Sequence, residues 1–237
     1  NIIDFPATPV SKQDQYKEVG SNSYHGGVIY HDDATLQPAL LYQGLLDIAT
    51  KAGVKVFENV SVKNVANLGT KFDVDIGERT VNSENVIIAT NGYTGTQFGK
   101  FRRRILPIRS AMIATEALPK ELIRSLSPNL RCHGGTERVV SYFRPSPDGT
   151  RMLFGGRSQG LGDQPEKYAK FLRGLMLDVY PQLENVKIDY AWSGLVAYTF
   201  DHIPHLGKLD GLYYAMGYCG SGVGRANYFG RKIALKL

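Results

Sequence analysis

The feature that most constrains this chain is a glycine-rich turn near its C-terminus. Residues 212–216 have the apolar composition of a buried strand, and glycines follow at positions 217, 220, 222 and 224. An amphipathic helix then runs to the last residue. Glycines at the start of a helix let backbone N–H groups approach an anionic or strongly polar ligand, which the helix dipole also favours. The sequence therefore predicts that this turn forms part of a ligand site.

The position of the turn argues against a dinucleotide-binding fingerprint. Such a fingerprint opens a βαβ unit and is followed by a second strand and by an acidic residue about twenty positions later. Here the sequence ends with the helix that follows the turn. We therefore expect the turn to complete a site whose main part is built by earlier residues.

Composition indicates an ordinary globular chain of one or two domains. Of its 237 residues, 43% are hydrophobic and 21% are charged, as is typical of globular proteins. No apolar run is long enough to span a membrane, we expect no signal peptide, and two cysteines cannot build a disulfide framework. We therefore expect a cytoplasmic protein with no membrane partner. Because the chain starts with Asn1 rather than Met, we also expect an upstream portion.

The net charge of +6 is weak support for a nucleic-acid partner. The densest basic run is Arg102-Arg103-Arg104, with Lys100 and Arg109 nearby. Nucleic-acid binding requires basic residues spread over one face, with exposed aromatic residues between them. The excess here is scattered, so we interpret the run as a solvated loop or strand edge.

The first block of the chain, up to residue 97, carries the signals of an α/β fold. Residues 1–30 show no regular pattern. A helix is expected from Pro38, ending near Gly53, because apolar residues recur at helical spacing. The strands expected in this block are 54–57, 60–65, 71–76, 79–81 and the buried run 86–89, which ends in the polar turn 90–93.

The middle of the chain has a different pattern. Alternating segments predict a largely antiparallel sheet, and helices at 119–126 and 166–179 are expected to cover it. The expected strands are 105–115, 139–143, 152–155 and 187–196. We therefore predict an α/β chain in an α+β two-domain arrangement, with residues 98–202 inserted into a discontinuous domain of residues 1–97 and 203–237.

Short motifs follow one another in a fixed order along nearly the whole chain. They are Gly26-Gly27, Leu36-x-Pro38, Gly44-Leu45, Val86 to Tyr93, Pro107-x-Arg109, Tyr142 to Gly149, Leu153 to Arg157, Trp192-x-Gly194, Thr199-x-Asp201-x-x-Pro204-x-x-Gly207 and Gly217 to Val223. In this order and spacing the chain resembles the FAD-dependent D-amino-acid oxidase/glycine oxidase superfamily, in its γ-glutamylputrescine oxidoreductase-like branch. The resemblance implies a Rossmann-like FAD-binding domain that lacks its first βαβ unit, and an inserted substrate domain.

The resemblance also implies which residues contact FAD. The C-terminal turn would lie against the isoalloxazine ring, where backbone N–H groups stabilise the negative charge that a hydride brings to the ring. An ordinary strand–helix connection is the alternative for the turn, and core packing is the alternative for Val62. The implied cofactor-binding residues are Val62, Thr90, Asn91, Gly92, Gly217, Tyr218, Cys219, Gly220, Ser221, Gly222 and Val223. Alone, the chain would lack the pyrophosphate and ribose contacts.

On the substrate side, the resemblance favours an amine over an amino acid. Relatives that oxidise amino acids carry an arginine for the substrate carboxylate where Val196 stands here. Candidate catalytic residues are Tyr142 and Arg144, and the candidate pocket residues are His25, Tyr142, Trp192 and Tyr198. The alternatives are an ion pair for the arginine, core packing for the aromatic residues and a solvated turn for the histidine.

Two further comparisons with relatives and two local sequence features bear on the chemistry. Gly194 stands where sarcosine-oxidase-like relatives carry a flavin-linking cysteine, so FAD is expected to be non-covalent. Gly224 stands where they carry an oxygen-activating lysine, which leaves oxygen or another electron acceptor open. We expect Cys219 to pack as a small residue rather than act as a nucleophile. The two histidines of Asp201-His202-x-x-His205 do not share a helix face, so no metal site is predicted.

These observations predict an FAD-dependent amine oxidoreductase that passes a hydride from the substrate to the flavin. Three alternatives stay open. The first is a glycine or D-amino-acid oxidase, which would need another arginine in the pocket. The second is an RNA-modifying flavoenzyme of the same superfamily, and the third is a non-catalytic fragment that cannot bind FAD alone.

Overall fold

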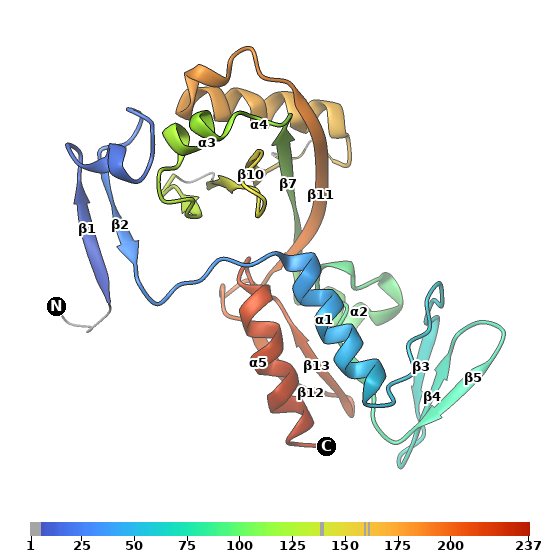
Figure 1. Cartoon of the computed structure of the whole chain (residues 1–237). Coiled ribbons are helices and arrows are strands. Elements are labelled where there is room, and N and C mark those ends of the chain that lie inside the picture. The colour runs from blue at the N-terminus through green and yellow to red at the C-terminus, as the bar shows by residue number, and fades with distance from the viewer. Residues whose placement is uncertain (1–5, 138–139, 159, 161) are drawn as a thin grey trace. The chain divides into compact units, whose positions relative to one another are not determined.

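The computed structural model describes residues 6–137, 140–158, 160 and 162–237, which form two compact units. Unit 1 comprises Asn1–Gln37 and Arg109–Gly194, and unit 2 comprises Pro38–Ile108 and Leu195–Leu237. The strands β7 (Leu106–Thr115) and β11 (Ile188–Tyr198) each run from one unit into the other (Figure 1). Residues 1–37 therefore group with the middle block, whereas the expected division placed them with the first block.

Unit 1 is built on a five-stranded sheet with the strand order β11-β7-β10-β9-β8. Strand β10 (Met152–Arg157) is antiparallel to both β7 and β9 (Ser141–Pro145), and β8 (His133–Gly134) is antiparallel to β9. These pairings confirm the expected antiparallel sheet. Val139, in the strand expected at 139–143, lies outside the described residues.

The hairpin between β9 and β10 turns as its sequence predicts. The backbone N–H of Gly149 donates to the Ser146 carbonyl at 2.8 Å, and Gly149 has a φ of 69°. Glycine tolerates this left-handed conformation without a steric penalty. The turn Ser146-Pro147-Asp148-Gly149 therefore fixes the register between β9, which precedes it, and β10, which follows it.

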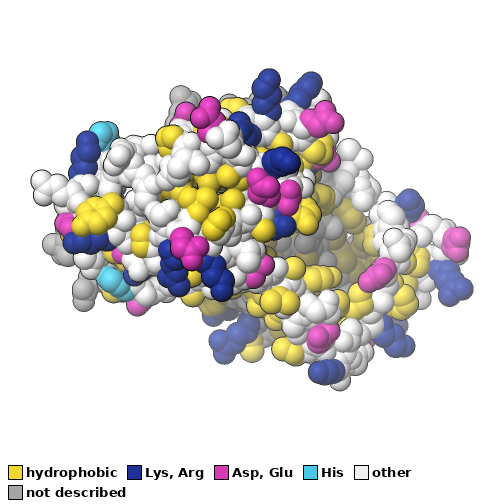
Figure 2. Space-filling view, turned by 45° about the horizontal axis from the view of Figure 1, so that its top comes forward, with side chains coloured by type: hydrophobic (Ala, Val, Ile, Leu, Met, Phe, Trp, Pro, Cys, Tyr) yellow, Lys and Arg dark blue, Asp and Glu magenta, His cyan; other side chains and the backbone are white. Residues whose placement is uncertain are grey.

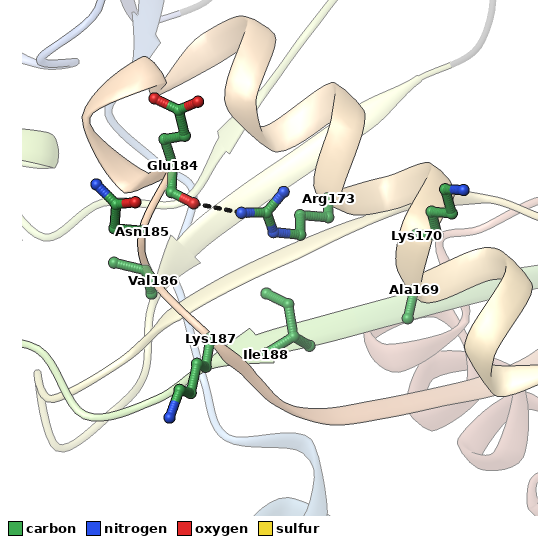
Figure 3. Close-up of a pocket in the computed structure, with 8 residues that line it drawn as sticks. All are labelled: Ala169, Lys170, Arg173, Glu184, Asn185, Val186, Lys187 and Ile188. Carbon is green, nitrogen blue, oxygen red and sulfur yellow. Dashed lines mark hydrogen bonds between the residues drawn. The ribbon is translucent and has the colours of Figure 1, made fainter.

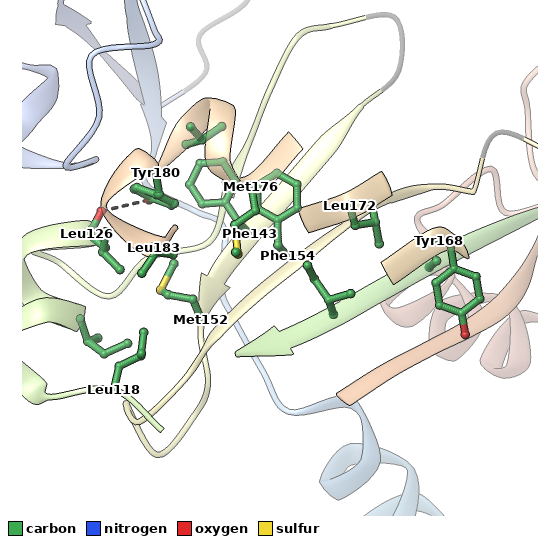
Figure 4. Packing of buried hydrophobic residues seen from close by; sticks show 14 residues of the cluster. Leu118, Leu126, Phe143, Met152, Phe154, Tyr168, Leu172, Met176, Tyr180 and Leu183 are labelled. Carbon is green, nitrogen blue, oxygen red and sulfur yellow. Dashed lines mark hydrogen bonds between the residues drawn. The ribbon is translucent and has the colours of Figure 1, made fainter. Parts of the chain in front are cut away.

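Helix α4 (Pro165–Val179) supplies one side of the core of unit 1 (Figure 4). The side chains that recur along one face of this helix are buried, as expected: Tyr168, Leu172, Met176 and Val179. They belong to the same cluster as Phe143 and Phe154, whose rings stack with centroids 5.5 Å apart. Helix α3 (Lys120–Leu126) joins this core, and its Leu126 carbonyl accepts a hydrogen bond from the Tyr180 hydroxyl at 3.0 Å.

The expectation that residues 1–30 are irregular is wrong for the described part of this segment. Strands β1 (Ala7–Ser11) and β2 (Gly26–Tyr30) pair antiparallel, with the short helix η1 (Gln15–Lys17) in the connection. A Cβ on Gly26 would lie 2.6 Å from the Val10 carbonyl oxygen. Neither strand has an apolar alternation, because both lie mostly exposed, so periodicity could not reveal this hairpin.

Unit 2 contains a parallel strand pair followed by the C-terminal helix. Strand β13 (Leu212–Met216) lies between antiparallel β12 (His205–Leu209) and parallel β6 (Ile87–Ile88), and α5 (Gly222–Ala234) follows. A separate meander joins β3 (Asn64–Asn67), β4 (Phe72–Asp75) and β5 (Thr80–Ser83). The remaining helices are α1 (Pro38–Lys51), η2 (Asn91–Tyr93), η3 (Thr96–Phe98) and α2 (Gly99–Arg102).

Two expectations for unit 2 need correction. Residues 54–63 form no strand; pairing begins at Asn64, and Asn59 takes a φ of 58° that interrupts an extended segment. Val62 is therefore not on a strand, although its side chain packs against the core cluster around Phe72 and Ile88. The run 86–89 pairs in parallel as expected but is not buried on both faces, because Ile87 is 44% exposed.

No helix in the described ranges of the chain is long and apolar enough to cross a membrane.

We predict that Leu172→Ala lowers the free energy of unfolding by about 2–5 kcal/mol, because it leaves a cavity in a core where the side chain is fully buried. Lys170→Ala on the same helix is the matched control and should change stability by less than about 0.5 kcal/mol. Urea denaturation followed by circular dichroism measures both. Equal effects of the two substitutions would contradict this description of the core.

Candidate functional site

The turn between β13 and α5 adopts a conformation that requires its glycines. Gly217 and Gly220 have φ values of 72° and 95°, and Cys219 between them has a φ of 52°. A Cβ on Gly217 would lie 2.2 Å from Thr199 Cγ2, so no other residue fits there. The N–H of Cys219 donates to the Ala197 carbonyl at 3.0 Å, which holds the turn against the end of β11.

A side-chain hydrogen bond joins this turn to η2, as expected for two segments of one site. Asn91 Oδ1 accepts from the backbone N–H of Gly217 at 2.9 Å, and Asn91 has a φ of 44°. A Cβ on Gly92 would lie 2.8 Å from the Leu195 carbonyl oxygen. The predicted cofactor residues Asn91, Gly92 and Gly217 therefore lie side by side in unit 2, and Thr90 is linked to them through its hydroxyl, 2.8 Å from that of Thr94.

The N-terminus of α5 is open to a ligand. Ser221 does not cap the helix with its side chain, because its hydroxyl donates to the Tyr218 carbonyl at 2.7 Å. The first backbone bond of the helix runs from Arg225 N–H to the Ser221 carbonyl. The preceding N–H groups, on Gly222, Val223 and Gly224, thus point beyond the helix end. Gly220, Ser221, Val223 and Gly224 are exposed.

The side chains within the turn face the protein rather than this opening. Tyr218 is buried against Phe229 and Ile233, and burial raises the pKa of its hydroxyl. Cys219 Sγ lies 3.2 Å from the Gly217 carbonyl and 3.5 Å from Thr199 Oγ1. These contacts hold both side chains against the protein. Within the same unit, the Tyr198 hydroxyl lies 3.7 Å from where a Cβ on Gly220 would stand.

The sheet of unit 1 carries a second group of predicted residues on the face opposite α4. The Tyr142 hydroxyl is hydrogen-bonded to Ser110 Oγ. A Cβ on Gly155 would lie 2.2 Å from the Tyr142 ring and 2.1 Å from Met112 Sδ. Glycine at this position of β10 therefore leaves the space in which the Tyr142 ring lies across the sheet.

Trp192 shares this face with Tyr142. Ser193 Oγ accepts from the Arg109 guanidinium at 2.6 Å, and side chains alternate along each strand. Ser110 follows Arg109 and Trp192 precedes Ser193, so Ser110 and Trp192 lie on the opposite face of the sheet from Arg109 and Ser193. Tyr142 lies on the same face as Ser110, to which it is hydrogen-bonded. Trp192 is 44% exposed, so it is not a core residue.

The remaining predicted residues lie elsewhere. Arg144 donates to the carbonyls of Leu36 and Pro145, each at 3.0 Å, so its guanidinium contacts backbone in the described part of the chain. His25 is exposed, directly before β2. Tyr198 belongs to unit 2, whereas the other three pocket candidates belong to unit 1.

Sequence reasoning missed a polar network around Arg109. This residue was grouped with the nearby basic run, yet its guanidinium lies 3.1 Å from Asp163 Oδ1, which also accepts from Ser193 Oγ at 2.9 Å. The signal available was the Pro107-x-Arg109 motif on an expected strand. The network fixes the start of β7 against β11 and the loop before α4.

His205 Nε2 is hydrogen-bonded to Asp201 Oδ2 at 2.9 Å. The backbone N–H of Ile203 and the ring of His205 lower the pKa of Asp201 to about 2. Within the described ranges no three His, Cys, Asp or Glu residues are grouped so as to hold a metal ion.

A surface groove beside α4 carries no feature of a chemical site (Figure 3). Its volume is about 580 Å³, and its basic residues are Lys170, Arg173 and Lys187. The Arg173 guanidinium donates to the Glu184 carbonyl, where it stabilises the chain after the helix.

On the face of the molecule seen in Figure 2, cationic and anionic side chains are interspersed.

Comparisons with known proteins identify relatives of this chain. The probable oxidoreductase OrdL of Haemophilus influenzae is 34% identical over 223 residues, which are 92% of this chain and 51% of that protein. The γ-glutamylputrescine oxidoreductase of Escherichia coli is 32% identical over 220 residues, again 92% of this chain and 51% of that protein. The chain thus spans about half the length of the curated relatives it matches.

A solved structure shares the fold. The glycine oxidase of Geobacillus kaustophilus superposes with a TM-score of 0.80 at 18% identity, over 98% of this chain and 62% of that one. At this level of identity the likeness shows the fold alone. The family described as FAD dependent oxidoreductase matches residues 5–235. The chain therefore belongs to this FAD dependent oxidoreductase (DAO) family.

Proposed function

We propose that the native protein containing this chain is an FAD-dependent oxidoreductase that oxidises the C–N bond of an amine. The observation that carries the proposal is the turn held by Asn91, which presents the uncapped N-terminus of α5. Family membership and the γ-glutamylputrescine oxidoreductase among the relatives support the choice of reaction.

The residues of the turn fit a flavin. A planar ring with carbonyl acceptors needs N–H donors and close backbone approach, and the side chains of Tyr218 and Cys219 turn away from the opening. The Gly222, Val223 and Gly224 N–H groups would hold the ring, without a covalent link. When bound, FAD would accept a hydride from the carbon next to the substrate nitrogen, leaving an imine that water hydrolyses.

The open sheet face of unit 1 is the part we propose for the amine. Ser110 fixes the Tyr142 hydroxyl, and exposed Trp192 provides an aromatic surface on the same face. An aromatic surface suits an amine, whether neutral or cationic. Arg144 is engaged by backbone carbonyls, and Val196 offers no charge for a carboxylate. These features favour an amine over an α-amino acid. We propose that oxygen or another electron acceptor takes the electrons from the reduced flavin. We also propose that the protein acts in the cytoplasm.

We predict that the native protein containing this chain purifies with a visible flavin absorption spectrum. Anaerobic addition of γ-glutamylputrescine or putrescine should bleach that spectrum faster than glycine or D-alanine does. A stopped-flow absorbance measurement compares the four. Faster bleaching by glycine or D-alanine would establish an amino-acid oxidase instead, and the absence of flavin would refute the proposal.

We predict that Asn91→Gly weakens flavin binding at least about tenfold, the equivalent of about 1.4 kcal/mol. Glycine keeps the positive φ but removes the oxygen that holds Gly217. Asn67→Gly is the matched control, because the Asn67 amide donates to the Asp210 carbonyl at 3.0 Å in the same unit. Fluorescence titration of the apoprotein with FAD measures both. Equal losses would mean that the Asn91 bond has no special role at the flavin.

A further inference from the structure

A cavity of about 640 Å³ lies within unit 1. One side is formed by η1 and the β1–β2 hairpin, and the other by residues 131–136 around β8. Its volume falls in the range of small-molecule sites, about 300–1,000 Å³. Val19, Val28 and the buried ring of Phe143 give it apolar walls.

This cavity gathers buried polar atoms that lack hydrogen bonds. Among the described residues, two buried side-chain oxygens have no partner, Gln15 Oε1 and the Tyr24 hydroxyl, while a third, Glu18 Oε2, makes no hydrogen bond but is ion-paired with Arg131 Nε at 3.1 Å. All three residues line the cavity. An unsatisfied buried polar group costs about 1–3 kcal/mol, so two of them in one cavity, beside a carboxylate, point to a bound partner.

The Gln15 side chain is fixed with its acceptor free. The residue is 7% exposed, and its Nε2 donates to the Ser21 carbonyl at 2.8 Å. The Gln15 backbone carbonyl accepts from the N–H of Val19 at 2.8 Å. Because the amide nitrogen is used, Oε1 is the atom left for a ligand. It can only accept a hydrogen bond.

The other groups of the cavity also favour a donor as ligand. Glu18 Oε2 lies 3.1 Å from Arg131 Nε, so this carboxylate and this guanidinium are already paired, and a second carboxylate, that of Asp33, also lines the cavity. Burial, together with the Glu137 carboxylate, raises the pKa of Tyr24 to about 12. Burial lowers the pKa of His133 to about 4, so its ring is neutral near pH 7. Among the described lining residues, the one Lys or Arg, Arg131, is paired with Glu18. An anion would therefore meet acceptors without a free Lys or Arg, whereas an N–H donor would find hydrogen-bond acceptors.

We propose that this cavity binds an organic ammonium ion, whose N–H groups donate to Gln15 Oε1, the Glu18 carboxylate and the Tyr24 hydroxyl. The apolar body of the ligand packs against Val19, Val28 and Phe143. The charge-assisted hydrogen bonds supply the specificity and the apolar walls add affinity. This site is independent of the flavin reaction proposed above, and its test requires no flavin.

Isothermal titration of the native protein containing this chain with three matched probes tests the ligand class. Butylammonium carries both charge and N–H donors, 1-pentanol has no charge, and butyltrimethylammonium has charge without N–H donors. Butylammonium should bind at least about tenfold more tightly than either of the others, since a hydrogen bond to a charged group contributes about 1.5–3 kcal/mol. Equal binding of all three, or no binding of butylammonium, would overturn the proposal.

Substitutions at Tyr24 and Gln15 locate the binding site. Tyr24→Phe removes a hydroxyl without a partner, so it should weaken butylammonium binding at least about tenfold while leaving the unfolding temperature unchanged or higher. Gln15→Met, which removes the other acceptor, should weaken binding similarly. Unchanged affinity in both variants would overturn the proposal.

Two control variants separate this cavity from general effects. Tyr180→Phe breaks the buried bond to the Leu126 carbonyl, so it should lower the unfolding temperature and leave butylammonium affinity unchanged. Tyr142→Phe is the comparison variant, because Tyr142 lies on the sheet face that we propose above for the amine substrate. A loss of affinity in Tyr142→Phe but not in Tyr24→Phe would place the ammonium on the sheet face and overturn the cavity assignment, while leaving the flavin proposal intact.

Discussion

The hydrogen bond from Gly217 N–H to Asn91 Oδ1 joins two loops that are 126 residues apart in the sequence. It exists because β6 and β13 run parallel, with Ile87 opposite Tyr213, so that both strands end at the same edge. Ligand sites in open α/β sheets form at such edges. The bond sets the path of the turn after β13, and that path decides where the N-terminus of α5 points.

Glycines then make this edge accessible, and they do so in both units by the same physical means. In unit 2, Gly217 removes a Cβ that would collide with Thr199, and Gly92 removes one that would meet the Leu195 carbonyl. In unit 1, Gly155 opens the space over which Tyr142 lies. The positions of the candidate residues thus depend on the space that these glycines leave, as well as on hydrogen bonds. Substitution at these glycines would displace the residues proposed to bind ligands.

Much of this arrangement can be predicted from the sequence, because the strongest signals are local. The 3.6-residue period identified α4 and its buried face, and Ser146 to Gly149 identified a hairpin. The hairpin β1–β2 escaped prediction because its strands lie mostly exposed and carry no alternation. The apolar segment 54–57 was predicted to be a strand because of its composition, but it pairs with no strand, and Phe57 is 74% exposed.

The candidate site was predictable in its segments but not in its contacts. Glycine spacing and the polar end of a strand singled out Gly217 and Asn91, whereas their mutual bond follows only from strand topology. Arg144 illustrates the limit. The sequence offered it as a candidate catalytic residue with an ion pair as the alternative, yet its guanidinium donates to the carbonyl of the next residue, Pro145, and to that of Leu36, which the fold brings close. The cavity lined by Gln15 could not be predicted from the sequence, because its buried polar atoms come from the segment between β1 and β2, which has no hydrophobic periodicity.

The most direct test of the central claim is amide hydrogen exchange at residues 217–224 in the native protein containing this chain, with and without bound FAD. If the N-terminus of α5 holds the flavin, exchange at Gly222, Val223 and Gly224 slows when FAD binds, while exchange in the β3–β5 meander does not change. Unchanged exchange at these three residues, in a sample whose spectrum shows bound flavin, would contradict the account.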